Sequence, residues 1–100
     1  MREDSAGRGV VRLLNTAGGP VLCLAGEVGP AAVHSFHRRY GWEPVRVAGI
    51  DAGSVTGLSA PGLELLLDHL DAAAYRGRPV PLRPSPVVQR LLDGARAQPS

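Results

Sequence analysis

The stretch VLCLAGEVGP, residues 21–30, decides how this chain folds. Its apolar run, 21–25, has the length of a buried strand, and Gly26 ends that run. Pro30 then stands where a helix would begin, since proline is favoured in the first helical turn. A strand that passes directly into a helix is the opening of a strand–helix–strand unit. The stretch therefore predicts an α/β domain.

Towards the N-terminus, a second apolar run precedes this stretch. Residues 10–14, VVRLL, have strand composition, and residues 16–20, TAGGP, have the composition of a turn. Two strand candidates separated by a glycine-rich turn predict an antiparallel hairpin.

Towards the C-terminus, helix and strand patterns alternate. Val33, Phe36 and Tyr40 share one helical face, so we expect a helix near 30–41 that ends at Gly41. A third strand is expected at Val45–Ile50, followed by a loop over residues 51–62 that is rich in Gly, Ser and Thr. The next helix is expected at 60–76, ending before Gly77. Its apolar face is predicted to comprise Leu63, Leu66, Leu67, Leu70 and Ala74.

The last two elements are short. A fourth strand is expected at Val80–Leu82, and Pro81 places it at a sheet edge because proline has no N–H to donate. Ser85 is a candidate N-cap, with Pro86 at the first position of a last helix over 86–95. The predicted buried residues are Leu66, Leu70, Val33, Phe36, Ile50 and Leu91.

The resulting order, β-β-α-β-α-β-α, predicts a small mixed β-sheet of about four strands with three helices packed on it. One hundred residues suffice for one such domain. We expect it to span 9–96, with a flexible N-terminus over 1–8 and a flexible tail over 97–100.

Composition excludes several functional classes. Hydrophobic residues make up 44% of the chain and charged residues 20%, which is typical of a globular domain. All 11 basic residues are arginines, they are scattered, and the net charge is only +2, so we expect no nucleic-acid partner. Cys23 is the one cysteine, which rules out an intramolecular disulfide. No signal peptide or long apolar segment is visible, so we expect a cytoplasmic protein without membrane insertion.

Three local signatures follow one another in register. The first is LAGEV at 24–28, and the second is IDAGSVT at 50–56. The third has three parts: a helix that opens at Gly62-Leu63, the Gly77 that follows this helix, and PSPVVQRLL at 84–92. This series resembles the STAS family of anti-sigma-factor antagonists. The resemblance implies a bacterial regulator of transcription that binds a kinase-type anti-sigma factor.

The resemblance also identifies a degenerate site. The family's loop commonly reads Asp-Ser-Ser-Gly, and its first Ser is phosphorylated by the partner kinase. Aligned on Gly62, those positions here are Ser59, Ala60 and Pro61. The phosphoacceptor position is therefore Ala60, which has no hydroxyl group. An Asp usually follows the first signature, and Gly29 stands in its place. We therefore expect no phosphorylation at position 60.

By the same resemblance, the partner binds the loop and the start of the second helix. The residues implied are Thr56, Gly57, Leu58, Ser59, Ala60, Pro61, Gly62 and Leu63. Ser59 is a candidate for a shifted phosphoacceptor, and its alternative role is a helix N-cap. Thr56 is a second candidate, and its alternative role is hydrogen bonding within the loop.

Two further groups of polar residues each allow a functional and a purely structural interpretation. His34 and His37, three residues apart on the first helix, could share a metal ion, but no further ligand lies near them in sequence, so we expect no metal site. Glu64, Asp68 and Asp71 form an acidic stripe on the second helix, which is either a solvated face or a docking surface for a basic partner.

Three more residues stand alone. Cys23 is read as a small core residue, His69 as exposed, and Trp42 as either a lid over the core or an exposed contact residue. The sequence matches no template for a nucleophile, a phosphate-binding loop or a metal cluster, so we expect neither catalysis nor a cofactor. Two alternatives to the anti-sigma-factor reading remain open. One is an accessory subunit of a transporter ATPase, and the other is a non-switching scaffold paralogue.

Overall fold

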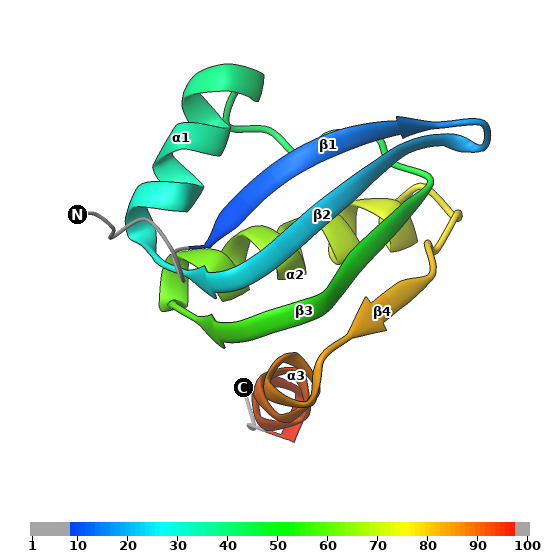
Figure 1. Ribbon diagram of the computed structural model, residues 1–100. Helices are drawn as coiled ribbons and strands as arrows, with labels where there is room; N and C mark the ends of the chain where they lie inside the picture. The colour runs from blue at the N-terminus through cyan, green and yellow to red at the C-terminus, as the bar shows by residue number, and fades with distance from the viewer. Residues whose placement is uncertain (1–8, 98–100) are drawn as a thin grey trace.

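A computed structural model describes residues 9–97 and shows a four-stranded mixed sheet with three helices, as the sequence predicts (Figure 1). In chain order the elements are β1 (Val10–Thr16), β2 (Gly19–Val28), α1 (Pro30–Tyr40), β3 (Gly49–Leu58), α2 (Ala60–Tyr75), β4 (Leu82–Pro84) and α3 (Pro86–Ala97).

The strands are ordered β1-β2-β3-β4 across the sheet. β1 and β2 form the predicted antiparallel hairpin, joined through Ala17 and Gly18, whereas β2, β3 and β4 are parallel neighbours. β4 lies at an edge, as predicted, although it begins two residues later than expected. Pro84 is tolerated there because an edge strand has one side without ladder partners.

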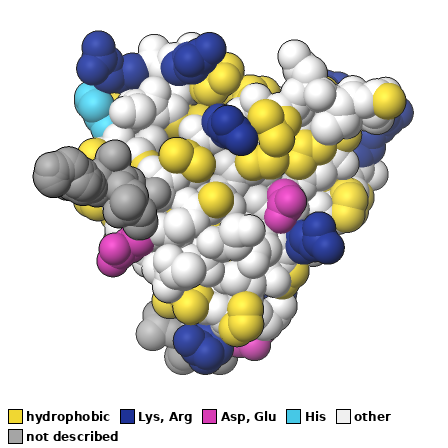
Figure 2. Space-filling view, viewed as in Figure 1, with side chains coloured by type: hydrophobic (Ala, Val, Ile, Leu, Met, Phe, Trp, Pro, Cys, Tyr) yellow, Lys and Arg dark blue, Asp and Glu magenta, His cyan; other side chains and the backbone are white. Residues whose placement is uncertain are grey.

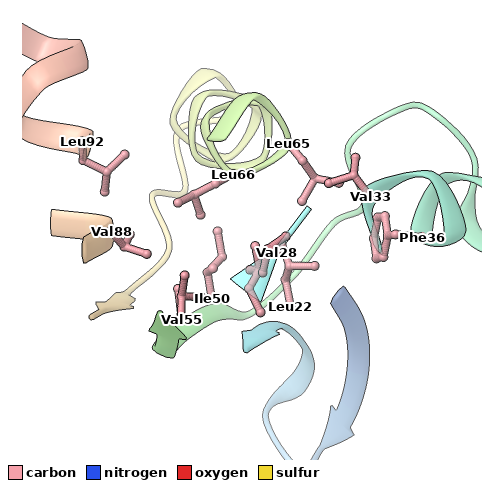
Figure 3. Close-up of a cluster of buried hydrophobic side chains, with 12 residues drawn as sticks. Leu22, Val28, Val33, Phe36, Ile50, Val55, Leu65, Leu66, Val88 and Leu92 are labelled. Atoms are coloured by element: carbon pink, nitrogen blue, oxygen red, sulfur yellow. The ribbon is translucent and has the colours of Figure 1, made fainter. Parts of the chain in front are cut away.

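The described helices pack on one face of the sheet and build the core there. Figure 3 shows side chains from the sheet converging with side chains from the helices. The core cluster consists of Leu22, Leu24, Val28, Val33, Phe36, Ile50, Ala52, Val55, Leu65, Leu66, Val88 and Leu92. In Figure 1 the sheet lies in front of α2, and its opposite face is turned to the viewer with no described helix across it.

The third strand lies further along the chain than predicted. β3 covers 49–58, so most of the expected loop is in fact a strand between β2 and β4, and 45–48 is not. Backbone N–H groups of the earlier segment bond elsewhere: that of Val45 donates to the His69 ring and that of Ala48 to the carbonyl of Pro20. Without ladder partners, Val45 and Val47 still pack against the core.

The buried face of α2 is rotated by one residue from the predicted face. Its fully buried members are Gly62, Leu65, Leu66, His69 and Ala73. Leu66 belongs to both faces, but the predicted Leu70 is only half-buried. His69 was expected to be exposed, and this was wrong, since it is 3% exposed.

Helix ends follow the predicted signals more closely. Gly41 terminates α1 at a φ of 91°, a backbone region that favours glycine. Ser85 caps α3 by accepting a hydrogen bond from the Val88 N–H at 3.2 Å. α3 continues through Gly94 to Ala97, two residues beyond the predicted end, and buries Val88 and Leu92 while Leu91 is half-buried. The segments 1–8 and 98–100 lie outside the described residues.

Candidate partner-binding site

A hollow of about 500 Å³ lies where the carboxyl ends of β2 and β3 meet. Its lining comprises Gly9, Glu27, Val28, Gly29, Pro30, Ala31, Ala32, Leu58 and Ser59. The N–H of Ser59 donates to the carbonyl of Val28 at 2.9 Å, which ties the end of β3 to the end of β2. Two of the positions that depart from the family pattern, Gly29 and Ser59, are thereby brought to one place. We refer to this feature as the β2–β3 hollow.

Ser59 has the capping role that was one of its two readings. Its Oγ accepts a hydrogen bond from the N–H of Gly62 at 3.3 Å, and its carbonyl accepts from the N–H of Leu63 at 2.8 Å. The residue is half-buried at the N-cap of α2. Its hydroxyl therefore already satisfies one of the free N–H groups of the first helical turn.

Gly62 lets α2 approach the sheet closely. A Cβ at this position would lie 2.7 Å from Leu58 Cδ1 and 3.2 Å from Val28 Cγ1. Only a residue without a side chain leaves those two atoms in place. The start of α2 is thus fixed against the ends of β2 and β3, and the one residue between β3 and α2 is Ser59.

The eight residues that the resemblance implies do not form the predicted loop. Thr56, Gly57 and Leu58 are the last residues of β3, and the others cap or begin α2. Thr56, Ala60 and Pro61 are exposed, whereas Gly62 is buried and the remaining four are half-buried. The accessible part of the predicted surface therefore combines a strand end with a helix start.

The charges around the β2–β3 hollow are unfavourable for a phosphate group. Among the described residues that line it, Glu27 is the charged one, and its carboxylate would repel an anion. Gly57 lies directly beneath this side chain, since a Cβ there would be 3.2 Å from Glu27 Cγ.

The acidic stripe predicted on α2 is accessible. Glu64, Asp68 and Asp71 are all exposed, as both of its readings require. They follow the exposed start of the helix at Ala60 and Pro61, so one continuous edge of α2 offers a small apolar start and then three carboxylates.

One of the two histidines of α1, His37, lies in the last turn of the helix. His37 Nδ1 lies 3.0 Å from the carbonyl oxygen of Gly41, and its ring stacks on Trp42 with centroids 4.1 Å apart. Trp42 is 73% exposed, so it is a surface residue and not a lid over the core. His34 is exposed. Within residues 9–97, no three His, Cys, Asp or Glu side chains gather in a way that could hold a metal ion.

Two titratable residues occupy environments that the sequence did not indicate. His69 donates from Nδ1 to the Leu65 carbonyl at 2.9 Å and accepts at Nε2 from the Val45 N–H at 3.0 Å. Burial lowers the pKa of its imidazole, and the Nε2 that accepts from Val45 carries no proton. Cys23 is half-buried on the helix-free face and is not in the core. Burial, and then the charge of Asp51, raises the pKa of its thiol.

Comparison with protein-family models, with curated proteins and with solved structures finds no match for this chain. No helix among the described residues combines the length and the apolar character needed to cross a membrane.

Proposed function

We propose that this chain is a regulatory protein-binding domain that acts as an anti-sigma-factor antagonist without serine phosphorylation. Its partner would be a kinase-type anti-sigma factor, and binding would involve the exposed residues Thr56, Ala60 and Pro61 together with the acidic stripe of α2. Because such a kinase uses ATP, the proposed place of action is the cytoplasm.

The observation that carries the proposal is the meeting of two family signatures at the β2–β3 hollow. The end of LAGEV and the start of α2 are hydrogen-bonded through Val28 and Ser59. The resemblance would require this proximity, because the family's acidic and phosphoacceptor positions surround one transferred phosphate. Here those positions hold Gly29, Ser59 and Ala60.

The chemistry of these three residues supports binding without phosphate transfer. Ala60 has no oxygen to accept a phosphoryl group. The Ser59 hydroxyl caps α2, and the charged side chain among the described residues that line the hollow is that of Glu27. Phosphate adds about −1.5 to −2 charges near neutral pH, so a chain that cannot take it lacks that means of breaking an interface. The complex would therefore be constitutive with respect to ATP.

Incubation with a kinase-type anti-sigma factor from the same genome tests the proposal. The chain should bind with and without ATP, and intact-mass spectrometry should find no added phosphoryl group. The triple variant Gly29→Asp, Ser59→Asp, Ala60→Ser should gain phosphate in part. A phosphate mapped to Ser59 or Thr56 of the wild type would show that the site has shifted and would contradict the proposal.

A pair of matched charge reversals tests the surface. Asp68→Arg on the acidic stripe of α2 should weaken binding, whereas Asp93→Arg on the exposed side of α3 makes the same change of charge elsewhere and should not. Equal effects of the two variants would exclude the acidic stripe as the contact. Absence of binding to every kinase-type partner would favour the transporter-subunit or scaffold alternative.

A further inference from the structure

The helix-free face of the sheet carries three rows of side chains that cross the strands. Leu22 and Leu24 point into the core, so their neighbours on β2 point the other way. The strand pairing then places side chains in register on the open face. The rows are Val10–Ala25–Ser54, Arg12–Cys23–Asp51–Arg83 and Leu14–Val21–Gly49.

This face is apolar around a charged centre. Val10 and Leu14 are 49% and 40% exposed, which is high for large apolar side chains of a strand. Figure 2, seen from this side, shows hydrophobic side chains gathered over the sheet with basic and acidic side chains among them. Large apolar side chains that are exposed together on one face are a feature of protein interaction sites.

We infer that a second copy of this chain covers the helix-free face, related to the first by a two-fold axis that runs along β2. The inference is independent of the proposed function, which concerns the ends of β2 and β3 and one edge of α2.

Charge complementarity selects this axis. Face-to-face packing about β2 places each β1 over the partner's β3, so Arg12 lies opposite Asp51 in two symmetric pairs, and Cys23 lies near its own copy. An axis between β2 and β3 would instead oppose Arg12 to Arg83. An axis along β3 would oppose Asp51 to its copy, and an axis across the strands would pair β1, which has no acidic residue, with itself.

The same axis complements the apolar rows. Val10 on β1 comes opposite Ser54 on the partner's β3, a large side chain against a small one, and Leu14 comes opposite Gly49, which is already buried within its own chain. Side chains of two packed sheets interdigitate over about 10 Å, so a large residue opposite a small one fits this spacing.

The size of the face predicts a weak dimer. Ten residues of β2 extend about 33 Å, and the three strands that overlap about this axis, β1 to β3, cover about 14 Å at about 4.8 Å spacing, which gives on the order of 500 Å². Stable interfaces bury about 800 Å² on each partner. We therefore expect reversible dimerisation in the micromolar range or above.

Sedimentation equilibrium over a series from micromolar to millimolar chain measures this directly. The wild type should pass from monomer to dimer. Arg12→Asp and Asp51→Arg should each raise the dissociation constant by about tenfold or more. The two changes together should restore it in part, because the pair is exchanged but the new guanidinium on β3 lies beside that of Arg83. Arg38→Asp, the same reversal on the exposed side of α1, should leave it unchanged.

Cross-linking of the unaltered face gives a second readout that needs no charge variant. Diamide, which is reduced to the hydrazine as it joins two thiols, should link two wild-type chains through a disulfide between the two copies of Cys23, and Cys23→Ser should abolish the product. A chain that stays monomeric to millimolar concentration overturns the inference. So does a dimer that neither charge reversal weakens, or one in which Cys23 does not cross-link.

Discussion

Truncation of Leu65 and of Leu67 distinguishes the observed face of α2 from the face that the sequence pattern favours. The leucine spacing predicts that Leu67 is buried and Leu65 is not, whereas the structure has Leu65 2% exposed and Leu67 half-buried. Both residues lie on the same helix and lose the same atoms on change to Ala. Differences in helix propensity therefore cancel between the two variants.

The expected magnitudes follow from burial. Leu→Ala removes three carbon groups at about 0.8 kcal/mol each when they are fully buried, and the cavity left behind adds to this. Leu65→Ala should therefore lower the free energy of unfolding by about 2–5 kcal/mol. The Leu67 side chain is partly in contact with solvent, so its burial contributes less to stability, and its removal leaves no closed cavity. Leu67→Ala should therefore cost about 1 kcal/mol.

Urea denaturation followed by circular dichroism measures both values. Leu66→Ala is the positive control, since Leu66 is 0% exposed and lies on both candidate faces. It should be destabilised by about 2–5 kcal/mol in either case. If Leu67→Ala costs as much as Leu65→Ala or more, the helix is not in the phase described and the reasoning is refuted.

Four further variants test single residues, and the last two form a matched pair of glycine changes. The unfolded chain protonates His69 near pH 6.5, whereas the folded chain does so only at lower pH. The free energy of unfolding should therefore be constant above about pH 6.5 and fall as the pH drops below it. His69→Gln should flatten this dependence in denaturation curves between about pH 6.5 and 5. Ser85→Ala removes a buried N-cap and should cost about 0.5–2 kcal/mol by urea denaturation. Gly41→Ala should destabilise the fold by about 1–3 kcal/mol, because the backbone at Gly41 has a positive φ. Gly94→Ala should stabilise it by about 0.5–1 kcal/mol, because alanine favours the helical conformation of α3 and nothing lies within 4 Å of the added Cβ. Thermal midpoints of the two variants that shift in the same direction would contradict this.

The third strand shows why a local pattern can place a strand wrongly. Residues 51–58 contain Gly53, Ser54, Thr56 and Gly57, which have the composition of a loop. In the sheet, two register shifts against β2 interrupt the alternation of inward and outward residues. A Cβ on Gly53 would lie 3.3 Å from Asp51 Oδ1 and 3.4 Å from Arg83 Cγ and Cδ, so neighbours that the sequence does not reveal favour a small residue at this position.

The buried face of α2 was predicted wrongly for a different reason. Leucines occur on two adjacent faces of the helix, and hydrophobicity alone favours the face that contains Leu63 and Leu70. The face that is buried includes Gly62 and His69, a glycine and a polar residue that such a count rejects. Gly62 is buried because α2 touches Leu58, and this contact depends on tertiary structure.

The candidate site was partly predictable. Parallel strands that each lead into a helix bring their carboxyl ends to one edge, so the proximity of Gly29 and Ser59 follows from the order of elements. The capping role of Ser59 follows from its place before Ala-Pro-Gly. The shape of the β2–β3 hollow does not follow, since it also depends on Gly9, which lies against the backbone of Glu27.

The imidazole of His69 has a consequence for amide hydrogen exchange. The Val45 amide proton is held by the unprotonated Nε2, 24 positions further along the chain. When that nitrogen takes up a proton it can no longer accept, and the segment between α1 and β3 loses this anchor to α2. The exchange protection of one amide outside every strand therefore reports the charge state of a buried ring. As the pH falls, the loss of that protection should precede the loss of protection in β2 and β3.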